Sequence, residues 1–325
     1  MIVTVTPNPS IDRTVTLPSP LTRGAVHRVT SVTSQAGGKG VNVARALTLA
    51  GLDAVAVLPA GPNDPLLSAL HTAAVTARAV PTSEPARTNL TITEPDGTTT
   101  KINEPGATLD AGTVTALTDA VLEAARDADW VVMSGSLPPG MPDSWYADVV
   151  ALMAEQRCRV AVDTSDAPLA ALVAALDRGA PDLIKPNAEE LAGVLGESPQ
   201  ALEDAVAQGD PEPVVVAARR LTDRGIGAVL ATLGAAGAVL VDATGAWMAT
   251  PPPIVPRSTV GAGDSSLAGY VRAEVGAATP PQRLRMAVAY GSAAAALPGT
   301  TLPGPTELDL DAVVVSPISP IPANR

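Results

Sequence analysis

The residues best suited to catalysis lie in a short stretch near the end of the chain, at positions 258–270. Gly261 and Gly263 flank Ala262 and allow a tight turn, and the small and apolar residues after them predict a helix. The first N–H groups of such a helix have no internal partner, so together with the helix dipole they can bind an anion. Asp264 follows directly, where it could take a proton from a hydroxyl that attacks phosphorus. We therefore expect phosphoryl transfer, with the dipole keeping Asp264 ionised and a weak base.

Two familiar glycine-rich loops do not fit this stretch. A dinucleotide-binding fingerprint is excluded because Ser266 occupies its third small position and the surrounding βαβ context is wrong. A Walker A loop is excluded because no Gly-x-x-x-x-Gly-Lys run followed by Ser or Thr occurs. On this motif alone, a helix entry with an aspartate near its N-cap is an equal alternative to a catalytic site.

A second glycine cluster encloses a lysine. Gly37 and Gly38 precede Lys39, Gly40 follows it, and the cluster opens a predicted helix that Gly51 ends. Three glycines around one cation bring backbone and positive charge close to something small and negative. A purely structural cluster is the alternative, and the enclosed lysine argues against it.

Composition limits the possible partners. The 325 residues include 33 Asp or Glu and 21 Lys or Arg, for a formal net charge of −12. Aromatic residues make up 2%, and no run of Lys or Arg occurs, which argues against binding to nucleic acid or to an anionic membrane. No stretch approaches the roughly 18 apolar residues of a membrane span, and no signal peptide is recognisable. Cys158 is the only cysteine, so we expect no disulfide and a cytoplasmic protein.

Alternating helices and strands fill the chain from Asp110 onward. Helices are expected at 110–126, 144–155, 166–176, after Asn187 and at 213–224, and strands at 130–133, 159–162, 183–184 and 229–232. Such an alternation with apolar strands predicts an α/β fold, a doubly wound and mostly parallel sheet with helices on both faces. Ligands of such sheets bind at the carboxyl ends of the strands, where residues 134–140 and 185–190 lie.

A small separate sheet is expected in the first third of the chain. Its segments are 11–17, 26–33 and 88–103, the last with a hairpin turn at Asp96 and Gly97. We expect one domain over residues 1–316 that includes this small sheet, and a surface tail over residues 317–325.

Asn187 and Glu190 form a possible metal-binding pair. They are three residues apart on a predicted helix and share one face. An amide and a carboxylate there could hold Mg²⁺ through its waters, because Mg²⁺ takes few protein ligands. A helix N-cap with an acid in the first turn explains the pair equally well.

Five motifs together resemble a known family. They cover residues 4–12, 37–45, 134–140, 185–191 and 259–264. At this spacing the chain resembles the ribokinase-like (PfkB) carbohydrate kinases over nearly its whole length. It is most similar to the branch of 1-phosphofructokinases and tagatose-6-phosphate kinases. One departure is Ser266, where that branch has a larger apolar residue.

The resemblance implies a doubly wound sheet with a β lid that closes over the sugar and often pairs with the lid of a second subunit. It makes Asp264 the base and assigns the transferring phosphoryl group to the N–H groups of Gly261, Ala262 and Gly263. For the substrate it implies Asp12, Gly37, Gly38, Asn42 and Ser136. For the nucleotide, ATP, it implies Lys185, Asn187, Thr232, Gly234 and Gly237. Asn187 and Glu190 would organise Mg²⁺ through water.

Three cations suggest that the substrate already carries a phosphate. Lys39, Arg87 and Lys101 come from separate segments that the implied fold brings to the lid side of the cleft. Uncompensated cations repel one another, so a neutral sugar would not require them and a sugar phosphate would. Solvated surface lysines and arginines are the alternative.

These observations predict an ATP- and Mg²⁺-dependent kinase acting on a ketohexose phosphate, first of all fructose 1-phosphate. The same chemistry on fructose 6-phosphate or tagatose 6-phosphate is the nearest alternative. A ribokinase or nucleoside kinase is less favoured because of the three cations. A sugar-phosphate sensor without turnover is disfavoured because binding alone requires no base.

Overall fold

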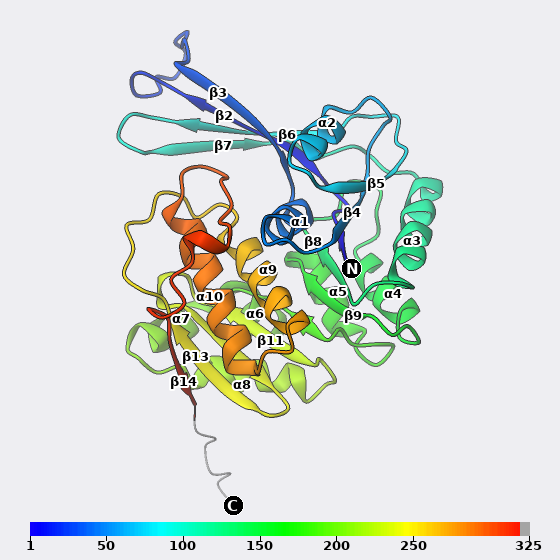
Figure 1. Ribbon diagram of the computed structural model, residues 1–325, viewed down its shortest axis with the longest axis vertical. Coiled ribbons are helices and arrows are strands. Elements are labelled where there is room, and N and C mark those ends of the chain that lie inside the picture. Colours follow the sequence, from blue (N-terminus) through cyan, green and yellow to red (C-terminus); the bar gives the residue numbers. More distant parts are fainter. Residues whose placement is uncertain (319–325) are drawn as a thin grey trace, which may run out of the picture.

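The computed structural model describes residues 1–318 and contains one large sheet, helices on both of its faces, and a smaller sheet that projects from one side (Figure 1). The large sheet has ten strands, in the order β14 (Val314–Pro317), β13 (Gly245–Thr250), β12 (Ala238–Asp242), β11 (Ala228–Thr232), β10 (Leu183–Ile184), β9 (Arg159–Asp163), β8 (Trp130–Ser134), β1 (Ile2–Val5), β4 (Ala54–Pro59) and β5 (Thr76–Val80). Neighbours from β11 to β5 are parallel, and β12, β13 and β14 add an antiparallel edge. The predicted fold class is therefore confirmed.

Helices cover both faces of this sheet. The helices that pack against one face are α1 (Lys39–Leu49), α2 (Pro65–Thr72), α9 (Ala262–Val275) and α10 (Pro280–Ala296). The helices that pack against the other face are α3 (Ala111–Ala125), α4 (Trp145–Leu152), α5 (Asp166–Ala174), α6 (Ala188–Leu195), α7 (Pro199–Ala207) and α8 (Glu212–Thr222). Short 3₁₀ helices occur at Gly234–Ala236 and Pro305–Glu307. None of the helices within residues 1–318 combines the length and apolar composition that crossing a bilayer requires.

The small sheet, which we call the lid, has four strands. Their order is β3 (Ser31–Gly37), β2 (Ser10–Thr16), β6 (Arg87–Thr93) and β7 (Thr99–Asn103). The sequence predicted a strand at 26–33, whereas the strand in the structure, β3, begins five residues later. It pairs with β2 from Ser31 opposite Thr16 to Gly37 opposite Ser10. Val26 precedes β3 and is 87% exposed. Because most residues of β3 are polar, its sequence does not show the apolar alternation typical of a strand.

Helix α7 and strand β14 were not predicted from the sequence. Helix α7 buries Leu202 and Val206, four residues apart, between Pro-rich and Gly-rich segments. Strand β14 pairs with β13 through Val314 to Pro317, so Pro317 belongs to the sheet and not to the predicted tail. The rest of that tail, residues 319–325, lies outside the described residues.

The turn after α9 holds an alanine in the left-handed region, and this predicts a stabilising substitution. Ala277 has a φ of +57°, whereas Gly276 before it has an ordinary φ of −77°. A side chain in this region costs about 1 kcal/mol or more, so we expect Ala277→Gly to raise the free energy of unfolding by roughly 0.5 to 1 kcal/mol. Urea denaturation measures the change. The control Ala50→Gly, at a φ of −81°, should lower the free energy of unfolding; a similar fall for Ala277→Gly would contradict the argument.

Candidate active site

The N-terminus of α9 lies beside a buried lysine. Gly261 caps the helix with a φ of +78°, a conformation that favours glycine. Lys185, which follows β10, lies against the first turn, since a Cβ added to Gly263 would come within 3.2 Å of its Nζ. The N–H groups of Gly263 and Asp264 and this ammonium therefore lie together, whereas the Ala262 N–H donates to the Thr259 carbonyl at 3.4 Å. Such a combination suits a phosphoryl group.

Asp264 lies in this first turn and is buried, with 7% of its surface exposed. Its Oδ2 accepts a hydrogen bond of 2.8 Å from Nδ2 of Asn42, on α1, which packs against α9. Burial and, to a smaller extent, repulsion by the nearby Asp163 carboxylate raise the pKa of Asp264 to about 6. The hydrogen bond from Asn42 and the charges of Lys39 and Lys185 lower this pKa but do not outweigh burial. The expectation that the helix dipole leaves a weak base is therefore wrong, because loss of solvent outweighs it.

Asp163 holds two lysines and was missed by the sequence analysis. It is the last residue of β9 and is 1% exposed. Its Oδ1 lies 3.1 Å from Nζ of Lys39 and its Oδ2 lies 3.3 Å from Nζ of Lys185. Burial alone would raise the pKa of Asp163, but the two ammonium groups outweigh it and lower this pKa. An acid at the carboxyl end of an apolar strand was the available signal.

Lys39 lies among three carboxylates. Burial alone would lower its pKa, but Asp163, Asp264 and Glu190 together raise it. The ammonium group is therefore held in its charged form beside Asp264. The structure thus brings together Lys39, Asp163, Lys185 and Asp264 from four separate segments, and both lysines and Asp264 belong to the predicted site.

Asp12 lies on β2 of the lid, in a small polar network. Its Oδ1 accepts from Oγ of Ser10 at 2.7 Å and from Nδ2 of Asn89 at 3.0 Å. A Cβ at Gly37 would collide with its carboxylate, so the glycine permits this close approach. At Gly38 the φ is +104° and a Cβ would come within 2.7 Å of the Thr6 side chain. Asn89 was not predicted, and its polar strand offered no specific signal.

Arg87 and Lys101 lie at different distances from this network. Arg87 begins β6, donates from NH1 to the Glu104 carbonyl at 3.2 Å, and has its pKa lowered by burial, with Asp12 opposing. Lys101 is exposed on β7 opposite Thr91, and within residues 1–318 no ion pair or side-chain hydrogen bond connects it to Asp264 or Asp12. The structure therefore brings Arg87 to the predicted site and does not bring Lys101.

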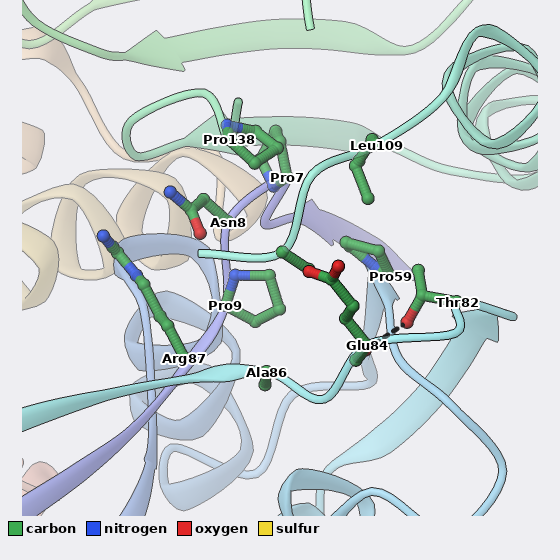
Figure 2. Close-up of a pocket in the computed structure, with 11 residues that line it drawn as sticks. Pro7, Asn8, Pro9, Pro59, Thr82, Glu84, Ala86, Arg87, Leu109 and Pro138 are labelled. Atoms are coloured by element: carbon green, nitrogen blue, oxygen red, sulfur yellow. Dashed lines mark hydrogen bonds between the residues drawn. The ribbon is translucent and has the colours of Figure 1, made fainter. Parts of the chain in front are cut away.

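Ser136 lies where the lid meets the large sheet. Asn8 donates from Nδ2 to the Pro105 carbonyl at 3.0 Å and to Oγ of Ser136 at 3.4 Å. Figure 2 shows Asn8 and Arg87 beside a small cavity at the base of the lid, which Pro138 of the Ser136 loop also lines. Asn8 thus connects three segments at the base of the lid.

Three of the five predicted nucleotide residues line a larger cavity of about 460 Å³, and Lys185 is not among them. Asn187, Thr232 and Gly234 line it, together with Glu203 and Val206 of α7. Gly237 does not line it. A Cβ at Gly237 would collide with the Ala249 carbonyl, so the packing of the β12–β13 hairpin already accounts for this glycine.

Comparison with known proteins identifies the family. The model of the pfkB family of carbohydrate kinases matches residues 5–307. The chain belongs to this family. It is 38% identical over 317 residues to the 1-phosphofructokinase of Rhodobacter capsulatus, covering 94% of each chain. It is 33% identical to the ATP-dependent 6-phosphofructokinase isozyme 2 of Escherichia coli, covering 93% of this chain and 94% of that one.

Solved structures of Escherichia coli phosphofructokinase-2 have the same fold. The complex with potassium has a TM-score of 0.85 at 31% identity and covers 94% of this chain and 96% of that one. The tetrameric inhibited form has a TM-score of 0.82 at 31% identity, with coverage of 92% and 95%. The five motifs found in the sequence therefore belong to a pfkB carbohydrate kinase.

Asn187 and Glu190 form the capping box of α6 in this pfkB kinase. Oδ1 of Asn187 accepts from the Glu190 N–H, and Oε2 of Glu190 accepts from the Asn187 N–H, both at 2.8 Å. Within residues 1–318, no hydrogen bond engages the other Glu190 oxygen, and no group of three acidic, His or Cys side chains could enclose a metal. One free carboxylate oxygen fits an Mg²⁺ ion that keeps most of its waters.

The raised pKa of Asp264 predicts how activity depends on pH. A general base acts only when it is deprotonated, so kcat/KM should fall as the pH drops through the pKa of about 6. Below that value we expect about a tenfold fall for each pH unit. Initial rates between pH 5 and 8 measure this limb, with the coupling enzymes in excess throughout. A limb near pH 4, the range of an ordinary aspartate, would contradict it.

Proposed function

We propose that this chain transfers the γ-phosphoryl group of ATP to the 6-hydroxyl of fructose 1-phosphate, giving fructose 1,6-bisphosphate and ADP. The main support is the Asp264 carboxylate, buried in the first turn of α9 with a pKa of about 6 and with Lys39 and Lys185 nearby. Relatives named 1-phosphofructokinase at 36% and 38% identity support the substrate. An ATP-consuming kinase with a lone cysteine also fits the cytoplasm.

The proposed substrate site lies between the lid and the large sheet. Asp12 and Asn89 present a carboxylate and an amide that can hold sugar hydroxyls, and Gly37 and Gly38 allow close approach. Arg87 supplies a guanidinium near Asp12 for the phosphate that the sugar already carries. Lys101 remains a candidate only if the lid moves, because it lies farther out on β7.

The proposed reaction is a direct displacement. Asp264 takes the proton of the sugar hydroxyl while the oxygen forms a bond to the γ-phosphorus, and the bond from phosphorus to the bridging oxygen of ADP breaks. Lys39, Lys185 and the N–H groups of Gly261, Ala262 and Gly263 bind the charge that is spread over the transferring group. Mg²⁺, held through water by Glu190, would neutralise charge on the nucleotide phosphates.

The nearest alternative is the same transfer to fructose 6-phosphate or tagatose 6-phosphate. The relative named ATP-dependent 6-phosphofructokinase, at 33% identity, favours the first of these. The substrates differ in which end of the sugar carries the phosphate, since fructose 1-phosphate has it on C1 with the acceptor hydroxyl on C6, whereas fructose 6-phosphate and tagatose 6-phosphate have it on C6 with the acceptor hydroxyl on C1.

A coupled ADP-release assay tests the proposal. The purified protein is offered fructose 1-phosphate, fructose 6-phosphate, tagatose 6-phosphate, ribose and adenosine with ATP and Mg²⁺. We expect the highest kcat/KM for fructose 1-phosphate. A preference for another sugar phosphate would replace the substrate and keep the mechanism, whereas no ADP release with any of the five would overturn the kinase proposal.

We also propose that two copies pair through the outer face of the lid. Directly paired residues lie on one face of a sheet, and Val15 faces both Val32 and Ile92 while Leu90 faces Ile102. The opposite face carries the polar residues of the substrate site. Val32 is 45% and Ile102 is 55% exposed, so the apolar face lacks cover within residues 1–318. A second lid would bury it, and the tetrameric relative supports an oligomer.

A charged substitution on this face should dissociate the dimer. Val32→Lys places an ammonium on the apolar surface, so we expect the dissociation constant of the dimer to rise at least tenfold. Light scattering measures the resulting change from dimer to monomer. Val216→Lys, at a 47% exposed position on α8, is the matched control and should not change the mass. A wild-type monomer, or a dimer that Val32→Lys leaves intact, would contradict pairing through the lid.

A further inference from the structure

Arg45 connects the lid to helix α1. Its NH1 donates to the Ala36 carbonyl at 3.1 Å, and its NH2 donates to Oε1 of Gln35 at 2.6 Å. Both acceptors belong to β3, whose first strand residues are exposed and whose last residues lead into α1. Arg45 itself lies in the second turn of α1. One guanidinium therefore holds the inner end of a lid strand against the helix that carries Lys39 and Asn42.

The same guanidinium reaches the residue that contacts Asp264. NH1 carries two hydrogens, and besides the Ala36 carbonyl it lies 3.5 Å from Oδ1 of Asn42, one turn earlier on α1. The other side of that amide, Nδ2, donates to Asp264 at 2.8 Å. A donor toward Oδ1 and an acceptor toward Nδ2 select a single orientation of the Asn42 amide. The flipped amide would place its oxygen against the Asp264 carboxylate.

We propose that Arg45 is a positioning residue that couples the placement of lid strand β3 to the orientation of the Asn42 amide beside Asp264. The inference rests on the proposed role of Asp264 as the base. Asp12 on β2 is the charged lid group near enough to influence Arg45. When β3 lies in place, its two acceptors hold the guanidinium where NH1 faces Asn42. When β3 moves away, Arg45 loses both lid acceptors, and the Asn42 amide is no longer restricted to the orientation that favours proton transfer.

A double-mutant cycle tests the coupling through Asn42. We expect Arg45→Met to lower kcat by about tenfold while KM for ATP changes less than about twofold, because the residues that line the nucleotide cavity do not include any of β3. In the Asn42→Ala background the same substitution should change kcat by less than about twofold. Arg45→Lys, which keeps one donor, should recover part of the loss. Equal falls in both backgrounds, or no fall of kcat in the first, would overturn the proposal.

Hydrogen exchange of the β3 amides gives a readout that does not require activity. Arg45→Met should speed exchange at residues 35–37, and Asn42→Ala should not. Arg219→Met is the matched control, since Arg219 on α8 donates to the Asp242 carbonyl at 2.7 Å in a similar helix-to-strand contact far from the lid. It should leave both kcat and β3 exchange unchanged. Unchanged exchange in Arg45→Met overturns the lid contact, whereas a wild-type protein without kinase activity overturns the proposed function instead.

Discussion

Replacing Asp264 with asparagine is expected to lower kcat by about 10²- to 10⁴-fold, the usual effect of removing a general base. The two side chains have nearly the same shape, and Nδ2 of Asn42 can donate to the new amide oxygen as it now donates to Oδ2 at 2.8 Å. Sugar phosphate and ATP should therefore bind with little change. Only the ability to accept a proton is lost. The ADP-release assay gives kcat, and calorimetric titration with the sugar phosphate gives the affinity.

The same substitution is expected to stabilise the fold at pH 8. Burial and Asp163 raise the pKa of Asp264 from 3.8 to about 6 in the folded chain. A raised carboxylate pKa contributes stability below pH 3.8, and this contribution is lost as the pH rises through 6. At pH 8 the ionised side chain thus costs the fold on the order of 2 to 3 kcal/mol, which an uncharged amide avoids.

Urea denaturation at two pH values separates this effect from a general change in packing. The asparagine variant should exceed the wild type in free energy of unfolding at pH 8, and the difference should shrink as the pH is lowered toward 5. Near-normal turnover would refute the role of Asp264 as the base. A variant less stable than the wild type at pH 8 would refute the electrostatic argument alone.

Local sequence patterns predicted most of the fold. The glycine pair and the small residues after it predicted a turn and a helix, and α9 begins at Ala262. Apolar strands followed by helices predicted the parallel part of the large sheet, because each unit is specified by its own residues. Strands whose stability depends on pairing with another segment of the chain were not predicted correctly. β3 is polar and is held by β2, and β14 is held by β13 at the sheet edge.

The site was predictable in its residue types and not in its electrostatics. The sequence shows Asp264 after Gly263, but its pKa depends on Asn42 and Asp163, which the fold brings from other elements. Lys39 and Lys185 were predicted for different ligands, and the structure holds both on one carboxylate. Spacing along the chain contains no information about such a shared partner. The meeting of these three groups in one place had to come from the fold.

Asp163→Asn is the second substitution with a large expected effect, because it removes the charge that holds two lysines together. The amide would leave the ammonium groups of Lys39 and Lys185 without their shared counterion in a buried place. Removing one partner of a buried ion pair costs several kcal/mol, and since Lys39 is 37% exposed we expect a loss of roughly 2 to 4 kcal/mol. Displaced lysines should also lower kcat by on the order of 10²-fold.

The direction of the pH change distinguishes this role from a merely structural one. In the wild type, Asp163 raises the pKa of Asp264 by repulsion, whereas the two lysines lower it. Without the Asp163 charge, the repulsion is gone and both ammonium groups can turn to Asp264, so its pKa and the acid limb of kcat/KM should move below 6. Asp64→Asn is the matched control, because Asp64 is also buried but caps α2 and accepts from backbone N–H groups, with no lysine bound to it within residues 1–318. A general loss of stability would lower activity in both variants without moving that limb, whereas a limb that stays near pH 6 in Asp163→Asn would show that Asp163 does not set the basicity of Asp264.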